Sequence, residues 1–202
     1  MSIGPAELAF RAFLMPPATA IMRVLLNLRL RGMRNIPATG PVIVVANHGG
    51  YLDPIFLQTG TYRPIRYMMT SDFYDVLSVQ PVYRFFRAIR VNENGPARDS
   101  IRGALDVLKS GGVVGLFPEG QLSRDGELSP IRPGITFLGG RAQVPIVPAW
   151  IEGSYDVLRR GQVRPRIAPV SIAYGPPIAV NGKRDRSLPD RILAAWHELR
   201  DG

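Results

Sequence analysis

The sequence contains no cysteine and only two histidines among its 202 residues. A disulfide framework, a thiolate metal site and a cysteine nucleophile are therefore excluded, and so few histidines argue against a zinc site. Lysine is also scarce, because almost all of the 25 basic residues are arginine. The net charge of +9 predicts an anionic partner, which could be nucleic acid, phospholipid headgroups or a phosphorylated substrate.

The arginines do not gather in one basic run but spread from Arg11 to Arg200. Aromatic side chains are not interleaved with them as stacking platforms would require, so we expect no nucleic-acid partner. Two stretches, 159–166 and 181–187, are polar and rich in arginine and predict surface loops.

No apolar run near the N-terminus is long enough to cross a membrane. The longest charge-free run, 12–22, is broken by Pro16-Pro17 and falls short of the roughly 20 residues that a spanning helix needs. The composition of residues 5–24 indicates one or two short helices hinged at these prolines. We expect residues 1–25 to lie in the headgroup region of a membrane, the alternative being a helical hairpin packed on the domain itself.

Residues 26–202 alternate between strand patterns and helix patterns. Residues 26–31 alternate strictly between apolar and polar, as in a half-buried strand, whereas 41–46 are nearly all apolar, as in a strand covered on both faces. Further strand candidates lie at 64–69, 88–92, 113–117, 145–150 and 169–174. The sequence predicts a single α/β domain with a mixed, largely parallel central sheet flanked by helices.

A histidine, His48, directly follows the buried strand, where an α/β sheet opens its ligand crevice. Asp53 could not lie on the same face of one helix as His48, because side chains five residues apart on an ideal helix point about 140° away from each other. Gly49-Gly50 can bend the intervening segment, and Pro54 suits the first position of a new helix, which makes Asp53 the expected N-cap. A carboxylate beside one imidazole nitrogen would leave the other free to deprotonate a hydroxyl. The alternative is that Asp53 only caps a helix.

A second motif, Phe117-Pro118-Glu119-Gly120, ends the strand candidate at 113–117 and is followed by Ser123. Both motifs stand at the carboxyl ends of strands, so we expect them at one edge of the sheet. Backbone N–H groups around Gly120 could hold a phosphate or a developing oxyanion, and Glu119 could order the acceptor or a basic neighbour. An ordinary Pro-Glu-Gly turn is the alternative.

Together these residues resemble the glycerolipid acyltransferase family typified by lysophosphatidic acid acyltransferases, often called PlsC-like. The resemblance covers roughly residues 26–180. The family's first motif, Asn-His-x4-Asp, matches at Asn47, His48 and Asp53, and the third matches at Phe117 to Gly120 with Ser123. Further agreement lies in Pro133-Gly134 after Arg132 and in the fourth motif, Val144-Pro145-Ile146-Val147-Pro148.

The second motif departs from the family, in which a strand ends in an arginine that contacts the acceptor's phosphate. Here Glu93 stands at that position. Phosphate recognition would then pass to Arg90, Arg124 or Arg132, or the acceptor carries no phosphate there. The alternative to phosphate binding by Arg124 and Arg132 is that each is only a solvated surface charge. The neighbours of Arg90 should face the core, which turns Arg90 to the opposite side of its strand.

The resemblance implies an O-acyltransferase of phospholipid biosynthesis that needs no metal and no cofactor. The donor would be acyl-CoA or acyl-carrier protein, and the acceptor a lysophospholipid, most simply 1-acylglycerol-3-phosphate giving phosphatidic acid. His48 would act as the base oriented by Asp53. The substrate-binding residues would be Asn47, Arg90, Phe117, Pro118, Glu119, Gly120, Ser123, Arg124 and Arg132.

The same resemblance implies a peripheral membrane protein at the cytoplasmic face of the cell membrane, with the lipid surface as a partner. Because the sequence lacks a Gly-x-Ser-x-Gly elbow, we expect Ser123 to be a polar site residue and not a nucleophile. Two alternatives stand beside this function: acylation of a lysolipid without phosphate, such as an ornithine lipid, and a catalytically silent membrane-binding module.

Overall fold

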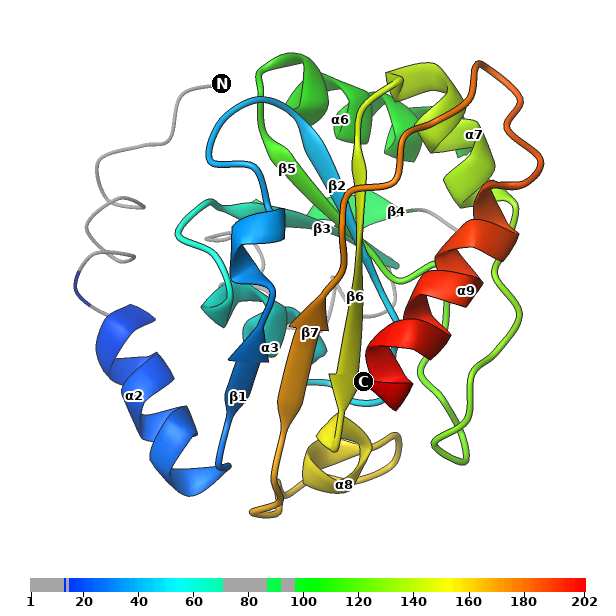
Figure 1. The fold of residues 1–202 in the computed structure, drawn as a ribbon. Coiled ribbons are helices and arrows are strands. Elements are labelled where there is room, and N and C mark those ends of the chain that lie inside the picture. Colours follow the sequence, from blue (N-terminus) through cyan, green and yellow to red (C-terminus); the bar gives the residue numbers. More distant parts are fainter. Residues whose placement is uncertain (1–12, 14, 71–86, 92–96) are drawn as a thin grey trace.

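The computed structural model (Figure 1) describes residues 13, 15–70, 87–91 and 97–202. The strands are β1 (Arg29–Arg31), β2 (Val42–Ala46), β3 (Ile65–Thr70), β4 (Ile89–Val91), β5 (Val113–Leu116), β6 (Ile146–Glu152) and β7 (Ser171–Tyr174). The helices are α2 (Met15–Leu25), the 3-10 turn η1 (Met33–Asn35), α3 (Asp53–Thr59), α6 (Ala97–Lys109), α7 (Gly134–Ala142), α8 (Ser154–Leu158) and α9 (Leu188–Asp201).

The strands form one sheet in the order β1-β7-β6-β2-β5-β3-β4. The five neighbouring strands β6, β2, β5, β3 and β4 run parallel to one another. β7 is antiparallel to β6 and parallel to β1. The predicted mixed, largely parallel sheet is therefore confirmed. The carboxyl ends of β2 and β5 lie side by side, because Val45 is paired with Leu116.

Helices cover the sheet on both faces, as expected for a largely parallel sheet whose central strands β2 and β5 are apolar throughout. Every residue of β2 is buried: Val42, Val44 and Ala46 face one core, and Ile43 and Val45 face the other. The first core includes side chains of α3 and α2, and the second includes side chains of α6, α7 and α9. Figure 1 shows α2 to the left of the sheet and α9 to the right.

The described part of the predicted N-terminal segment is helical. Pro16 and Pro17 lie within α2, and Phe13 before them is helical too. Residues 1–12 and 14 lie outside the described residues, so the predicted hinge at the two prolines and a separate first helix stay predictions. Among the described residues, no helix is long and apolar enough to cross a membrane.

Candidate active site

The imidazole of His48 contacts the carboxylate of Asp53. His48 follows β2, Asp53 is the first residue of α3, and His48 Nδ1 lies 2.9 Å from Asp53 Oδ2. A carboxylate can only accept a hydrogen bond, so Nδ1 carries the proton and Nε2 of the neutral ring has a free lone pair. Asp53 is fully buried, whereas the His48 side chain is 19% exposed. The predicted contact between the two residues is thus confirmed.

The prediction that Asp53 is the N-cap of the helix is wrong. Leu52 occupies the N-cap position and no side chain caps α3. The Asp53 carboxylate instead turns back onto the preceding loop, where Oδ2 also accepts the Gly50 N–H at 3.0 Å. Because the carboxylate serves His48 and the loop, helix capping does not explain Asp53.

The two glycines between this pair are required by packing and not by an unusual backbone. Neither Gly49 nor Gly50 has a positive φ. A Cβ on Gly50 would lie 2.5 Å from the Ser154 carbonyl oxygen, and one on Gly49 would lie 2.9 Å from Ser154 Oγ. The loop that carries His48 therefore rests on α8, an element that the sequence did not single out.

The imidazole is also held face to face with an aromatic ring. The rings of His48 and Phe117 are stacked with centroids 4.0 Å apart and planes inclined by 14°. Tyr67 of β3 stacks on the same Phe117 at 6.0 Å. The stack and the Asp53 hydrogen bond together fix both the plane and the rotation of the imidazole.

Glu119 binds the backbone of His48. Glu119 Oε1 accepts the His48 N–H at 2.9 Å, and Oε2 accepts the Ser129 N–H at 2.7 Å. The side chain is only 2% exposed. Burial raises the pKa of Glu119, and the hydrogen bonds from Ser129 and His48 oppose that shift. Both oxygens are thus occupied within the protein, which favours a positioning role over the predicted ordering of the acceptor.

Asn47 and Ser123 also hold the His48 loop. The Asn47 amide donates to the Ile151 carbonyl and accepts the Ile151 N–H, both at 2.8 Å. The Ser123 N–H donates to the His48 carbonyl at 2.8 Å, and Ser123 Oγ donates to the Glu127 carbonyl at 2.8 Å. Both N–H and C=O of His48 are therefore bound by the segment that follows β5.

Gly120 adopts a left-handed conformation with φ of 67°. Its N–H donates to the Phe117 carbonyl at 3.0 Å, so it is already used within the turn. The Arg132 side chain covers the same glycine, since a Cβ there would lie 2.7 Å from Arg132 Nε. Arg132 also donates its backbone N–H to the Pro118 carbonyl at 2.9 Å. Arg132 therefore places a cationic side chain against this turn, and that residue is exposed.

The other two arginines predicted to bind phosphate, Arg90 and Arg124, lie on β4 and in the loop after β5. Arg90 is exposed and pairs with Met69 in register, so it shares the sheet face of Tyr67 and points away from the core that Ile89 packs against, as predicted. Arg124 is exposed, and its carbonyl accepts the Tyr155 hydroxyl at 2.9 Å. Glu93 lies outside the described residues.

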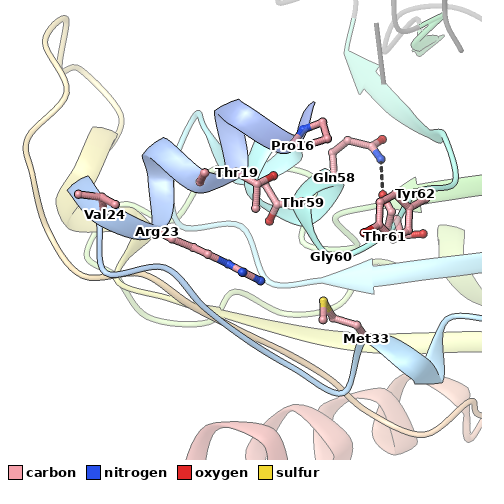
Figure 2. A pocket seen from close by; sticks show the side chains of 11 residues that line it. Pro16, Thr19, Arg23, Val24, Met33, Gln58, Thr59, Gly60, Thr61 and Tyr62 are labelled. Atoms are coloured by element: carbon pink, nitrogen blue, oxygen red, sulfur yellow. Dashed lines mark hydrogen bonds between the residues drawn. The ribbon is translucent and has the colours of Figure 1, made fainter. Parts of the chain in front are cut away.

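A cavity of about 480 Å³ lies apart from these residues, between α2, η1 and the end of α3. Figure 2 shows Arg23 and Thr19 of α2 facing Gly60 and Thr61 across it. Asp53 stands at the opposite end of α3, roughly 9 Å away at a rise of 1.5 Å per residue. None of the predicted site residues lines this cavity. Within the described ranges, no group of three His, Cys, Asp or Glu side chains could hold a metal ion.

The fold and the site define an α/β protein with a histidine–aspartate pair at the carboxyl edge of a largely parallel sheet. The chain belongs to the acyltransferase family, whose model matches residues 27–152, and it is of the PlsC-like, O-acyltransferase type.

The chain is similar to several 1-acyl-sn-glycerol-3-phosphate acyltransferases. A 1-acyl-sn-glycerol-3-phosphate acyltransferase of Bacillus subtilis (strain 168) is 26% identical over 71% of this chain and 75% of its own length. An enzyme of that name from Limnanthes douglasii is 30% identical over 67% of this chain, which spans only half of that relative. The crystal structure of the acyltransferase PlsC from Thermotoga maritima superposes with a TM-score of 0.73 at 20% identity, covering 97% of this chain and 87% of that one. At this identity the match shows a common fold.

Proposed function

We propose that this protein transfers a fatty acyl group from acyl-CoA or acyl-carrier protein to the free hydroxyl of a lysophospholipid, with 1-acylglycerol-3-phosphate as acceptor and phosphatidic acid as product. The observation that carries the proposal is the 2.9 Å contact between His48 Nδ1 and Asp53 Oδ2, which leaves Nε2 as a base on a partly exposed ring. The names of the relatives support the choice of acceptor.

In the proposed reaction, His48 Nε2 removes the proton of the acceptor hydroxyl while that oxygen attacks the thioester carbonyl carbon. The carbonyl π electrons move onto oxygen and form a tetrahedral oxyanion. When the oxyanion collapses, the C–S bond breaks and the thiolate takes the proton back from Nε2. Asp53 keeps its hydrogen bond to Nδ1 throughout and stabilises the transient imidazolium. No acyl-enzyme is formed.

Arg132 is the residue we assign to the acceptor's phosphate. Its side chain lies against the Gly120 turn, and Gly120 directly follows the glutamate that holds His48. An arginine suits a phosphate because its guanidinium offers paired N–H donors. Arg90 and Arg124 stay second candidates, Arg90 because it shares the sheet face of the ring stack.

The test is transfer of labelled acyl chains, from acyl-CoA and from acyl-carrier protein, to a panel of lysolipids by the purified chain. His48→Ala should lower kcat by about 10²- to 10⁴-fold, as for loss of a general base. His197→Ala is the matched control, since His197 lies exposed on α9. Full activity of His48→Ala would contradict the mechanism, and no transfer to any acceptor would favour the silent membrane-binding module.

A second candidate acceptor is a lysolipid without phosphate, such as a lyso-ornithine lipid. Its support is Glu93, an acidic residue where the family's phosphate-contacting arginine is expected. The panel separates the two acceptors. If phosphate is recognised, Arg132→Ala should raise the acceptor KM for 1-acylglycerol-3-phosphate about tenfold or more and leave that of the lyso-ornithine lipid unchanged.

We place the protein at the cytoplasmic face of the membrane as a peripheral protein. The support is α2, on which Ile21, Val24 and Leu25 are 56%, 82% and 53% exposed. Apolar side chains on the outside of a short helix suit burial at the headgroup boundary. Val24→Asp should weaken flotation of the chain with lipid vesicles, and unchanged flotation would remove this role from α2.

A further inference from the structure

The segment 159–167, which we name the arginine loop, exposes apolar and cationic side chains together. It connects α8 to the segment before β7 and holds four arginines and no acidic residue. Val163 and Ile167 are 94% and 77% exposed, among the most exposed aliphatic side chains of the described chain. Within the described residues, none of the four arginines forms an ion pair. Arg159 is half-buried with its guanidinium 5.3 Å from the centre of the Tyr155 ring, whereas Arg160, Arg164 and Arg166 are exposed. Exposed cations beside bare aliphatic side chains indicate an interaction site.

The loop stands on a fixed base. Tyr51 donates its N–H to the Leu158 carbonyl at 2.9 Å, and Arg166 donates its N–H to the Val157 carbonyl at 2.8 Å. Between them, the Gln162 N–H donates to the Arg159 carbonyl at 3.1 Å. Because these hydrogen bonds close the loop at its base, the loop holds Val163 in its exposed position.

The base of the loop borders both the active-site loop and the end of α2. Tyr51 lies three residues after His48, so the Tyr51 bond joins the loop to the catalytic edge of the sheet. The Val170 N–H donates to the Leu26 carbonyl at 2.9 Å, which joins the segment after the loop to the residue that follows α2. Figure 1 shows α8, the start of β7 and the end of α2 together at the lower side of the molecule.

We propose that the arginine loop is a second membrane contact, which binds anionic phospholipid headgroups through its arginines and inserts Val163 and Ile167 at the headgroup boundary. Basic residues near an anionic bilayer gain electrostatic attraction, and apolar side chains beside them add burial. A lipid surface suits this segment better than a protein groove does, because the apolar side chains protrude instead of lining a pocket. With α2 at its other side, the contact would turn the His48 edge toward the membrane that holds the acceptor.

The inference is tested by flotation of the full chain with vesicles of phosphatidylcholine alone or mixed with phosphatidylglycerol. R160Q/R164Q should weaken binding to the anionic vesicles by about fivefold for each arginine and change binding to neutral vesicles little. V163S/I167S should weaken binding to both. R184Q/R186Q is the matched control, since it removes two exposed arginines from the other arginine-rich loop and should bind more tightly than R160Q/R164Q.

Flotation needs no turnover, so its outcome is independent of the proposed reaction. Thermal unfolding and transfer to a dispersed short-chain lysolipid should be the same in these variants as in the parent chain. Unchanged flotation of both loop variants would overturn the proposal. It would also be overturned if the variants lost transfer from acyl-carrier protein but kept vesicle binding, because the loop would then dock the acidic carrier.

Discussion

The backbone N–H of His48 donates to the carboxylate of Glu119, 71 residues away, at 2.9 Å. The same carboxylate accepts the Ser129 N–H at 2.7 Å. Glu119 thus joins the loop after β2 to the loop after β5, and both loops contribute to one site. We therefore regard Glu119 as a positioning residue, which acts through His48 and not on the substrate.

Glu119→Gln should lower kcat while changing the KM values for donor and acceptor little. An amide has one acceptor oxygen, so one of the two backbone N–H groups would face an NH2 group. The loss should be about 1 to 3 kcal/mol of unfolding free energy, the cost of an unsatisfied buried donor. Urea denaturation and steady-state kinetics measure both effects.

Glu127→Gln is the control for this substitution, because Glu127 lies exposed a few residues from the same site. If Glu119→Gln instead raised the acceptor KM and left kcat unchanged, Glu119 would contact the acceptor and the positioning role would be wrong.

Asp53→Asn should lower kcat by about 10²- to 10⁴-fold with the protein still folded. An asparagine that donates its amide N–H to His48 Nδ1 moves the ring proton to Nε2, which can then no longer act as a base. Nitrogen-15 chemical shifts of the imidazole would report the tautomer directly. Asp106→Asn, at an exposed position of α6, should leave both kcat and the His48 tautomer unchanged.

The sequence predicts the parts of the site that depend on residue types at nearby positions in the chain. A β-branched run marks β2, and a histidine after it with an aspartate five residues on predicts the His48–Asp53 pair. Partners distant in the chain could not be predicted. Asn47 binds the backbone of Ile151, 104 residues away, and any residue except proline at 151 would offer the same two groups.

One further feature was missed although a weak signal exists. Tyr67 alternates with the residues of its strand that face the opposite core, so strand periodicity could have placed it on the His48 face. The antiparallel direction of β7, in contrast, has no signal in the length of its connection. Residues 153–170 lie between β6 and β7, include α8 and are long enough for the crossover of a dozen or more residues that a parallel pair needs.

Asp185 should contribute stability that depends on pH. Its burial alone would raise the pKa, but hydrogen bonds from the Asn181 N–H and the Ser187 hydroxyl, with the charge of Arg191, lower the pKa below its ordinary value. The unfolded chain therefore binds the proton more readily. The stabilisation is complete above the ordinary aspartate pKa of 3.8 and is lost as pH falls through the lowered value.

Asp185→Asn should accordingly be less stable than the parent at pH 7, by about 2 kcal/mol, as for hydrogen bonds to a charged group. This difference should shrink when urea denaturation is repeated near pH 3. Asp156→Asn, at an exposed position, should show no comparable loss. A difference between the Asp185 variant and the parent that grows toward low pH would mean that the carboxylate does not stabilise the fold.

Gly50→Ala should disturb the site more than any other single methyl group added to its glycines. The new Cβ would lie 2.5 Å from the Ser154 carbonyl oxygen and 3.1 Å from that of Leu158, so the His48 loop or α8 must move. Overpacking of this kind costs about 1 to 3 kcal/mol of unfolding free energy, and the shift should also lower kcat.

Gly134→Ala is the matched control. Nothing lies within 4 Å of a Cβ built on Gly134, and this glycine is the first residue of α7, where alanine favours the helix. Unfolding free energy and kcat of the two variants should differ accordingly, and equal values would show that α8 does not position the His48 loop.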